Sequence, residues 1–177
     1  MPLTKPMTES ELIDACLGGD RLAQKKLYDK YSTAMFTLAY RMTSDFDLAN
    51  DILQEAFIKI FRSLHQFRRE STLGAWIKTI VIRTALGWLK KQMPLSALPE
   101  DLHNHYIDWG HSLDTEYLEK AIQSLPAGYR TVFVLIEVEG YAHKEVAELL
   151  NISTGTTKSQ LFHAKKKLKE YLMNTDE

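Results

Sequence analysis

Two segments near the carboxy-terminal end, residues 141–150 and 154–172, have the residue types and spacing of a pair of DNA-reading helices. Apolar or small residues recur in both at intervals of three and four. Asn151 stands between them, where a tight turn often needs the left-handed backbone that Asn tolerates. The run Ser153-Thr154-Gly155-Thr156 can cap the helix that follows. We therefore expect a helix-turn-helix over residues 144–162, with its second helix in the major groove of DNA.

Polar and basic residues on the expected outer side of that second helix are candidates for contact with DNA. The polar residues near the start of this helix can contact bases, or a phosphate bound by the free amide groups of the helix start. The lysines that follow are expected to contact phosphates only. Thr157 is the one polar side chain that we expect to point inward. The candidates are Thr154, Thr156, Lys158, Ser159, Gln160, His163, Lys165, Lys166 and Lys167.

The net charge of -1 hides three blocks of opposite sign. Residues 59–91 contain eight basic residues and one acidic residue, and residues 154–170 contain five lysines and one acidic residue. Between these blocks, residues 92–119 contain six acidic residues and neither Lys nor Arg. This order of basic, acidic and basic blocks suggests that different parts of the chain meet different partners.

Helical periodicity also runs through the first half of the chain, so the fold class is predicted to be all-α. A capping box, Thr8-x-x-Glu11, begins a short helix that ends at Gly18. A second helix begins at Asp20, with Leu22, Leu27, Tyr31, Ala34, Met35 and Leu38 on its buried face. A third covers residues 47–64, and a fourth covers residues 72–92.

The third helix combines a wide apolar stripe with an acidic outer face. Ala49, Ile52, Leu53, Ala56, Phe57, Ile60, Phe61 and Leu64 form the stripe, and Asp51, Gln54 and Glu55 lie opposite. An acidic face suits a basic groove on another protein and would repel DNA.

A break after the fourth helix separates two small helical domains. Pro94 and Pro99 interrupt the periodicity, and the connection is too long for a tight turn inside one compact domain. We place the first domain at residues 8–93, a flexible acidic linker at 94–115, and the second domain at 116–173. A chain of 177 residues is long enough for two such domains.

Composition excludes several classes of protein. There is no apolar stretch of membrane-spanning length and no secretory signal at the start, so we expect no membrane insertion and a cytoplasmic location. The single cysteine, Cys16, excludes a disulfide framework and is expected to be a small core side chain. No phosphate-binding loop or nucleophile motif appears, so we expect no enzyme activity and no cofactor.

Taken together, residues 9–172 resemble the extracytoplasmic-function (ECF) group of RNA polymerase sigma factors, within the sigma-70 superfamily. Three segments carry the resemblance in the same order as in that family: DFDLANDILQEAFIKIFRSLHQF, FRRESTLGAWIKTIVIRTALGWLKK, and LEKAIQSLPAGYRTVFVLIEVEGYAHKEVAELLNISTGTTKSQLFHAKKKL. The three segments in this order are far more specific than any one of them.

This resemblance implies an alternative sigma factor that binds core RNA polymerase and directs promoter-specific transcription initiation. The partners implied are the clamp helices of the largest subunit, which would meet Asp51, Gln54 and Glu55, the polymerase flap, promoter DNA and an anti-sigma factor. The second domain would read the minus-35 element, and the acidic linker would thread into the polymerase channel. The fourth helix and the loop before it would open and read the minus-10 element through Phe67, Arg68, Arg69, Ser71, Thr72, Lys78, Arg83, Lys90 and Lys91.

Some residues depart from the family pattern. Arg83 stands where many members have Asn, and Gln160 and His163 replace positions that are often Arg. Because Gln favours adenine edges where Arg favours guanine, the promoter sequences cannot be copied from relatives. The genes served and the inducing signal stay open as well.

Two other functions compete with this interpretation. A dimeric helix-turn-helix regulator that binds a duplex operator explains the second domain but not the basic fourth helix. A metal enzyme is suggested by His103, His105 and His111, with Asp101 and Asp108 nearby. These residues lie in a Pro-interrupted segment with no expected helix or strand to orient ligands, so we expect no metal site.

Overall fold

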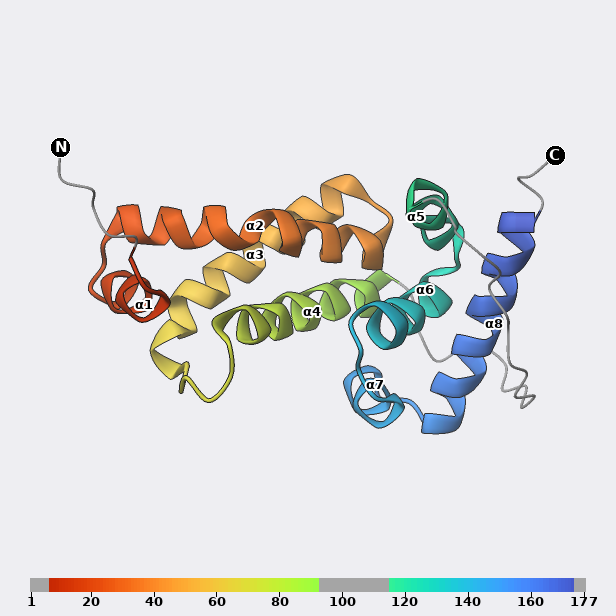
Figure 1. Cartoon of the computed structure of the whole chain (residues 1–177). Helices are drawn as coiled ribbons and strands as arrows, with labels where there is room; N and C mark the ends of the chain where they lie inside the picture. Colours follow the sequence, from red (N-terminus) through yellow and green to blue (C-terminus); the bar gives the residue numbers. More distant parts are fainter. Residues whose placement is uncertain (1–6, 93–114, 174–177) are drawn as a thin grey trace. The chain divides into compact units, whose positions relative to one another are not determined.

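The computed structural model describes residues 7–92 and 115–173, and every regular element in those ranges is helical (Figure 1). The elements are α1 (Glu9–Leu17), α2 (Arg21–Thr43), α3 (Phe46–Ser63), the 3-10 helix η1 (Leu64–Gln66), α4 (Leu73–Gln92), α5 (Thr115–Ser124), α6 (Ala127–Phe133), the π-helical turn η2 (Val134–Val138), α7 (His143–Leu150) and α8 (Thr154–Met173). The predicted all-α class is confirmed. None of the described helices combines the length and apolar character needed to cross a membrane.

The chain forms two compact units. The first comprises Met1–Ala39 with Asp47–Ala85, and the second comprises Tyr40–Phe46 with Leu86–Glu177. Helices α2 and α4 therefore contribute residues to both units, and α3 contributes its first residue, Phe46, to the second. The linker predicted over residues 94–115 lies outside the described residues except for its last residue, at which α5 begins. The proposed functional boundaries stay a prediction.

The first unit is built around the apolar stripe of α3. Its buried residues are Leu48, Ala49, Ile52, Leu53, Ala56, Phe57 and Ile60, which include most of the predicted stripe. On α2, Leu27, Met35 and Leu38 are buried as predicted, but Leu22 is 72% exposed and Ala34 is exposed as well. Ala23 is the buried residue at this end of α2, because its spacing of four from Leu27 places it on the same face.

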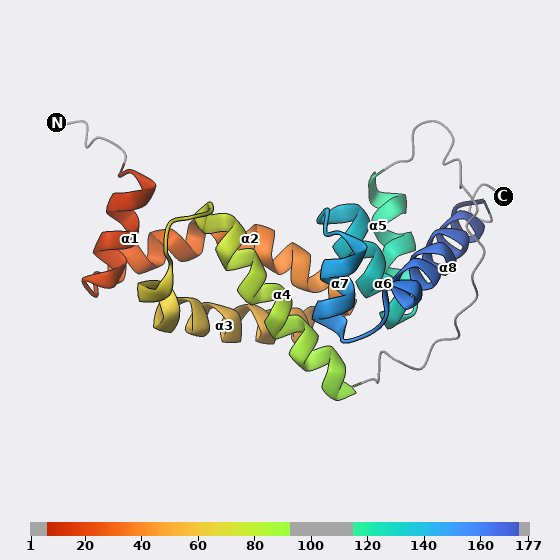
Figure 2. The same cartoon turned by 90° about the horizontal axis from the view of Figure 1, so that it is seen from below.

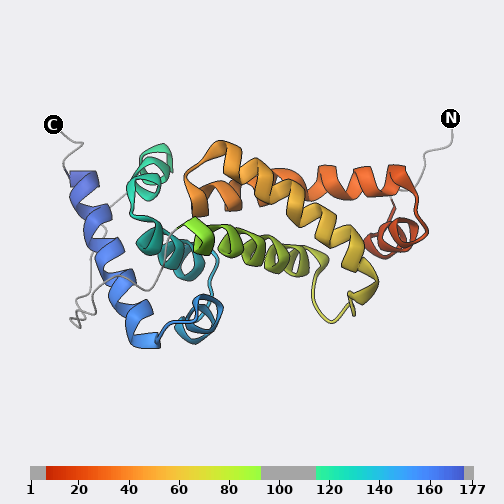
Figure 3. The same ribbon diagram turned by 180° about the vertical axis from the view of Figure 1, so that it is seen from behind.

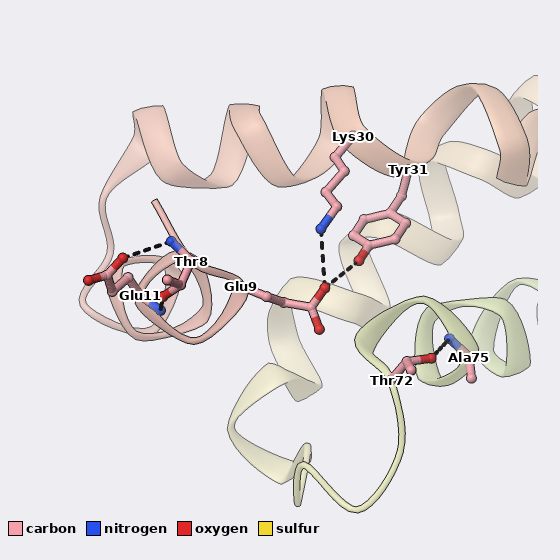
Figure 4. A network of polar contacts seen from close by, with 7 residues as sticks. All are labelled: Thr8, Glu9, Glu11, Lys30, Tyr31, Thr72 and Ala75. Carbon is pink, nitrogen blue, oxygen red and sulfur yellow. Dashed lines mark hydrogen bonds and ion pairs between the residues drawn. The ribbon is translucent and has the colours of Figure 1, made fainter. Parts of the chain in front are cut away.

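Helix α1 lies beside the end of α3 and η1 (Figures 2 and 3). The predicted capping box is present: the backbone nitrogen of Glu11 donates to Thr8 Oγ1 (3.3 Å), and that of Thr8 donates to Glu11 Oε2 (2.7 Å) (Figure 4). These bonds satisfy two amide groups that a helix start otherwise leaves without partners. Cys16 is buried, as predicted for a small core side chain.

In the second unit, Arg130 of α6 is buried with only 6% of its surface exposed. Its guanidinium donates to the carbonyl oxygens of Met42 (3.2 Å) and Thr43 (2.9 Å), at the end of α2. It also donates to those of Gln123 (3.1 Å) and Leu125 (2.8 Å), at the end of α5. A cation suits this position because carbonyls without helical partners make a helix end negative. Burial lowers the pKa of Arg130.

The stretch from Ala127 to Glu139 was expected to be a continuous α-helix, but it widens into η2 over Val134–Val138. The backbone nitrogen of Glu139 donates to the carbonyl of Val134, and that of Tyr141 donates to the carbonyl of Leu135, both at 2.9 Å. The first bond spans five residues instead of four, as in a π turn, and the second spans six. Val134 and Leu135 remain buried, so the wider turn still contributes apolar side chains to the core.

His143, at the start of α7, connects the two helices of the helix-turn-helix. Its Nδ1 lies 3.0 Å from Thr157 Oγ1, and that hydroxyl donates to the carbonyl of Thr154 (2.9 Å). Nδ1 is therefore assigned as the donor to Thr157. Burial lowers the pKa of His143, and the nearby charges of Lys158 and Lys165 lower it further, while Glu137 opposes them.

Replacing Arg130 with Met should lower the free energy of unfolding of the second unit by roughly 2–4 kcal/mol, because buried carbonyls lose charged hydrogen-bond donors. The free energy of unfolding of Arg130→Lys should lie between that of the unaltered protein and that of Arg130→Met. An ammonium group keeps the charge but cannot reach four carbonyls in the same geometry. Urea titration followed by circular dichroism measures the change. Lys144→Met, which alters an exposed cation on α7, is the control. Equal midpoints for the Arg130→Met and Lys144→Met proteins would contradict this role.

The lowered pKa of His143 predicts that the stability of the second unit falls with acidification. The unfolded chain takes up its proton as the pH drops through about 6.5, while the folded chain resists until the pH passes its lower pKa. The stability that the neutral ring contributes is thus fully present above about pH 6.5, and it is lost as the pH falls through the lower pKa of the folded protein. Urea midpoints at about pH 7.5 and about pH 5.5 should differ less for His143→Gln than for the unaltered protein. An unchanged difference would assign the pH dependence to other groups.

Candidate functional site

The predicted acidic surface on α3 contains an apolar centre that the sequence interpretation missed. Asp51 and Gln54 are exposed, and Glu55 forms an ion pair with Lys59 (2.7 Å) while its side chain stays 42% exposed. Ile58 is 51% exposed and follows Asp51, Gln54 and Glu55 at spacings of seven, four and three, so it shares their face. We call these four residues the α3 outer face. The same spacing rule applied to the sequence would have found Ile58.

The loop between η1 and α4 is fastened at both ends. At its start, the ring of Phe67 lies 5.4 Å from that of Trp76, at a tilt of 45°. At its end, Thr72 Oγ1 accepts a hydrogen bond from the backbone nitrogen of Ala75 (3.2 Å) and so caps α4 (Figure 4). Phe67 and Thr72, both predicted to meet DNA, therefore also hold the loop in place.

In the middle of this loop, Arg69 has a left-handed backbone, with φ at +61°. This conformation costs a residue other than Gly about 1–2 kcal/mol. The guanidinium of Arg69 donates to the hydroxyl of Ser10 and to the carboxylate of Asp14, both on α1. Its neighbours Arg68 and Ser71 have exposed side chains.

The basic residues predicted on α4 do not all lie on one side of the helix. Arg83 and Lys90 are seven residues apart, about two turns, so they share a face, whereas Lys78 lies on another. Arg83 is exposed, and Lys90 donates to the carbonyl of Leu149 (3.3 Å). Lys91 lies over the ring of Trp88, 5.6 Å from its centroid. Both tryptophans of this region are half-buried.

The turn of the helix-turn-helix has the predicted geometry. Asn151 ends α7 in the left-handed region, with φ at +55° and ψ at +49°. Ser153 then caps α8, because its Oγ accepts a hydrogen bond from the backbone nitrogen of Thr156 (2.9 Å). Val146, Ala147 and Leu150 are buried on α7. Thr157, predicted to point inward, is fully buried.

The outer side of α8 is smaller than predicted. Thr154, Lys158, Lys166 and Lys167 are exposed, and Thr156 is half-buried. The expectation that Ser159 and Gln160 point outward is wrong, since they are 3% and 2% exposed. Gln160 lies four and eight residues before Ala164 and Leu168, and this spacing places it on the buried stripe of α8.

Two other predicted DNA contacts on α8 already have partners within the second unit. The ring of His163 stacks on that of Tyr129 of α6, at 5.7 Å between centroids and 25° between planes. Lys165 forms an ion pair with Glu137 of η2 (2.6 Å), and their side chains are 25% and 35% exposed. These contacts hold α8 against α6 and η2. Lys166 and Lys167 are the exposed lysines next to them.

No group of three or more His, Cys, Asp or Glu side chains that could hold a metal ion occurs within residues 7–92 and 115–173. The five residues behind the metal-enzyme alternative, His103, His105, His111, Asp101 and Asp108, lie outside the described residues.

Two family models match the chain in sequence order. Residues 27–94 match sigma-70 region 2, and residues 115–168 match sigma-70 region 4. The first range contains α3, the loop and α4, and the second contains the helix-turn-helix. A dimeric operator-binding regulator would account for the second match alone, so that alternative is not favoured.

Curated relatives match nearly the whole chain. The chain is 30% identical to the RNA polymerase sigma-H factor of Pseudomonas aeruginosa, over 93% of each protein. It is 29% identical to the ECF RNA polymerase sigma-E factor of Haemophilus influenzae, over 92% of this chain and 94% of the relative.

Solved structures agree with this assignment. The sigma factor RpoE of Bartonella quintana, in complex with the anti-sigma factor NepR, is 26% identical, with a TM-score of 0.56 over 84% of this chain and 96% of that one. CnrH, in complex with the cytosolic domain of CnrY, shares the fold at 17% identity, with a TM-score of 0.53 over 94% and 97% of the two chains. The chain therefore belongs to the ECF sigma factors, and it is an alternative sigma factor that directs transcription initiation by RNA polymerase.

Proposed function

We propose that this sigma factor divides its work among three surfaces and catalyses no reaction itself. The α3 outer face binds core RNA polymerase, the loop before α4 together with α4 opens and reads the minus-10 element, and α8 reads the minus-35 element. The observation that carries this proposal is the separation of charge: the surface assigned to a protein partner is acidic, and both surfaces assigned to DNA are basic.

The composition of the α3 outer face suits a protein partner. Asp51 supplies negative charge that attracts a basic groove and repels DNA. Glu55 adds to it once it leaves its ion pair with Lys59. Ile58 supplies an exposed apolar centre with a polar rim, the usual arrangement of a protein interface. Its partner is the clamp helices of the largest polymerase subunit, and the polymerase flap is a second contact, for the region 4 part of the chain.

The loop and α4 suit a separated DNA strand. Arg68 and Ser71 are exposed in the loop, and Arg83 is exposed on α4, so they can meet the backbone or an unstacked base. The half-buried ring of Phe67 offers a surface for stacking. Lys78, Lys90 and Lys91 add positive charge along the helix, although Lys90 must leave the carbonyl of Leu149 to reach a phosphate.

On α8, we assign the minus-35 contacts to the exposed side chains. Thr154, Thr156 and Lys158 lie at its start, where amide groups can also bind a phosphate, and Lys166 and Lys167 lie two turns later. His163 and Lys165 contribute once they leave Tyr129 and Glu137. A direct role for Ser159 or Gln160 requires their exposure on binding.

We assign the protein to the cytoplasm, where RNA polymerase and promoter DNA are found. RpoE of Bartonella quintana has been solved with the anti-sigma factor NepR. A partner of this kind that covers the α3 outer face would block polymerase binding and hold the present sigma factor inactive. We propose this as its mode of control.

A double substitution on the α3 outer face that changes its charge should weaken binding to core RNA polymerase. Asp51→Arg together with Ile58→Asp should lower affinity for core RNA polymerase at least about tenfold, because it reverses one rim charge and places another in the apolar centre. Run-off transcription with core polymerase on genomic promoter fragments should lose its defined start sites to the same extent. Thr33→Arg, which adds a charge at an exposed position of α2, should change neither. Normal transcription by the double variant would contradict the assignment.

The lysines of α8 should differ in their contribution to DNA binding. Lys166→Ala and Lys167→Ala should each weaken holoenzyme binding to promoters generally, and each should reduce the slope of log affinity against log salt by about 0.9. Lys165→Ala should reduce the slope less, since Glu137 already neutralises this lysine. Titrations from about 50 to about 200 mM KCl measure the slopes. A larger effect for Lys165 than for Lys166 would show that the Glu137 pair opens fully on DNA.

A further inference from the structure

Helix α1 lies outside the region 2 match, which begins at residue 27, yet it contacts the loop assigned to the minus-10 element. Arg69, in the middle of the loop, donates to Ser10 and Asp14 on successive turns of α1. Ser10 and Asp14 are four residues apart, so they lie on one face of the helix and meet one guanidinium together. The ion pair is exposed, with 44% of the Arg69 side chain and 62% of the Asp14 side chain accessible.

A second contact of α1, made by Glu9, joins it to α2. Glu9 Oε2 accepts hydrogen bonds from Lys30 Nζ (3.1 Å) and from the hydroxyl of Tyr31 (3.0 Å), both on α2 (Figure 4). The pKa of Glu9 lies below its ordinary value because of the bond from Lys30, with further contributions from Tyr31 and from the backbone of Leu73, the first residue of α4. Helix α1 therefore contacts the centre of the loop through Ser10 and Asp14, and it contacts α2 through Glu9.

The start of α4 packs against Tyr31, the same side chain that donates to Glu9. An added Cβ at Gly74 would lie 3.2 Å from Cε1 of Tyr31, so the tyrosine ring packs closely against the backbone there. Glu9 accepts from the hydroxyl of that ring. The position of α1 and the start of α4 are thus linked through one side chain of α2.

The loop needs such support because its middle residue is strained. Arg69 is left-handed without being Gly, Asn or Asp, the residues that most readily adopt this conformation. A strained residue persists only when its surroundings hold it in place. The two bonds from α1 are the contacts that the structure gives its side chain, whereas the neighbouring Arg68 and Ser71 remain exposed.

We propose that α1 is the positioning element of the promoter-reading loop, and that Ser10 and Asp14 hold Arg69 in its left-handed conformation so that Arg68 and Ser71 face the DNA. Arg69 then acts through the shape of the loop and is not itself a phosphate contact. This inference rests on the proposed role of the loop at the minus-10 element.

The alternative role for Asp14 predicts a change of opposite sign. If Asp14 merely neutralised a DNA-binding arginine, removal of its carboxylate would free Arg69 for phosphate and would increase promoter opening. If Asp14 positions the loop, its removal decreases opening. A reversed pair, Asp14→Arg with Arg69→Asp, separates the two roles further. It keeps an ion pair and places Asp at a left-handed position that Asp tolerates, but it removes positive charge from the loop.

The experiment measures promoter opening by holoenzyme, through the fluorescence of 2-aminopurine placed in the minus-10 element. Asp14→Ala and Arg69→Asp should each lower the opening equilibrium about three- to tenfold, the range expected for one exposed charged contact and its hydrogen bonds. The reversed pair should recover at least about half of that loss on the same scale. Affinity for core polymerase should not change in any of these proteins.

Asp29→Ala is the matched control, because it removes an acid from another exposed ion pair of the same unit, with Lys25 on α2. It should leave opening unchanged. Increased opening by Asp14→Ala, or a reversed pair that opens promoters no better than Arg69→Asp alone, would overturn the positioning role.

Variants of the exposed loop residues show which proposal has failed. If Arg68→Ala and Ser71→Ala lower opening while Asp14→Ala does not, the loop reads DNA without help from α1, and only this inference falls. If Arg68→Ala and Ser71→Ala leave opening unchanged while core polymerase still binds, the loop does not read the minus-10 element. The proposed function of the loop and the positioning role then fall together.

Discussion

The second unit depends on one buried cation that binds backbone instead of acid. Arg130 donates to carbonyls at the ends of α2 and α5, so two helix ends that could not be buried alone share one guanidinium. The same helix, α6, carries Tyr129, on which His163 of α8 stacks. The placement of the recognition helix therefore follows from how α6 is held, and the residue that holds α6 need never touch DNA.

The same division of residues occurs in the helices of the functional surfaces. Each helix buries its apolar residues in a core, and the charge of its exposed side chains decides which kind of partner it can bind. On α3 that remainder is acidic around Ile58, and on α8 it is mostly lysine. Because the acids of the α3 outer face and the exposed lysines of α8 lie on separate helices, polymerase and promoter need not compete for one surface. The exceptions are Glu55, Arg69 and Lys165, each of which already forms an ion pair inside its own unit.

Features that depend on local rules were predictable from sequence. The capping box at Thr8, the left-handed turn at Asn151, the cap at Ser153 and the stripe of α3 involve residues within a few positions of one another. Contacts between distant residues were not predictable in this way. Nothing near Arg130 indicates that carbonyls almost ninety positions earlier will meet it, and nothing near Arg69 indicates the acid on α1. Gln160 shows a different failure, since its polar type outweighed a spacing that already placed it beside Ala164 and Leu168.

The π turn η2 has a consequence for how the gene can change in length. A wide turn of this kind accommodates one residue more than an α-helix would hold over the same rise. Deletion of a single codon within Val134–Val138 would therefore let the helix close into regular α geometry while the following elements keep their direction. A further inserted residue would instead turn the chain after it by about 100°, and Glu137 would lose its register with Lys165. The stretch should therefore tolerate the loss of one residue better than the gain of one.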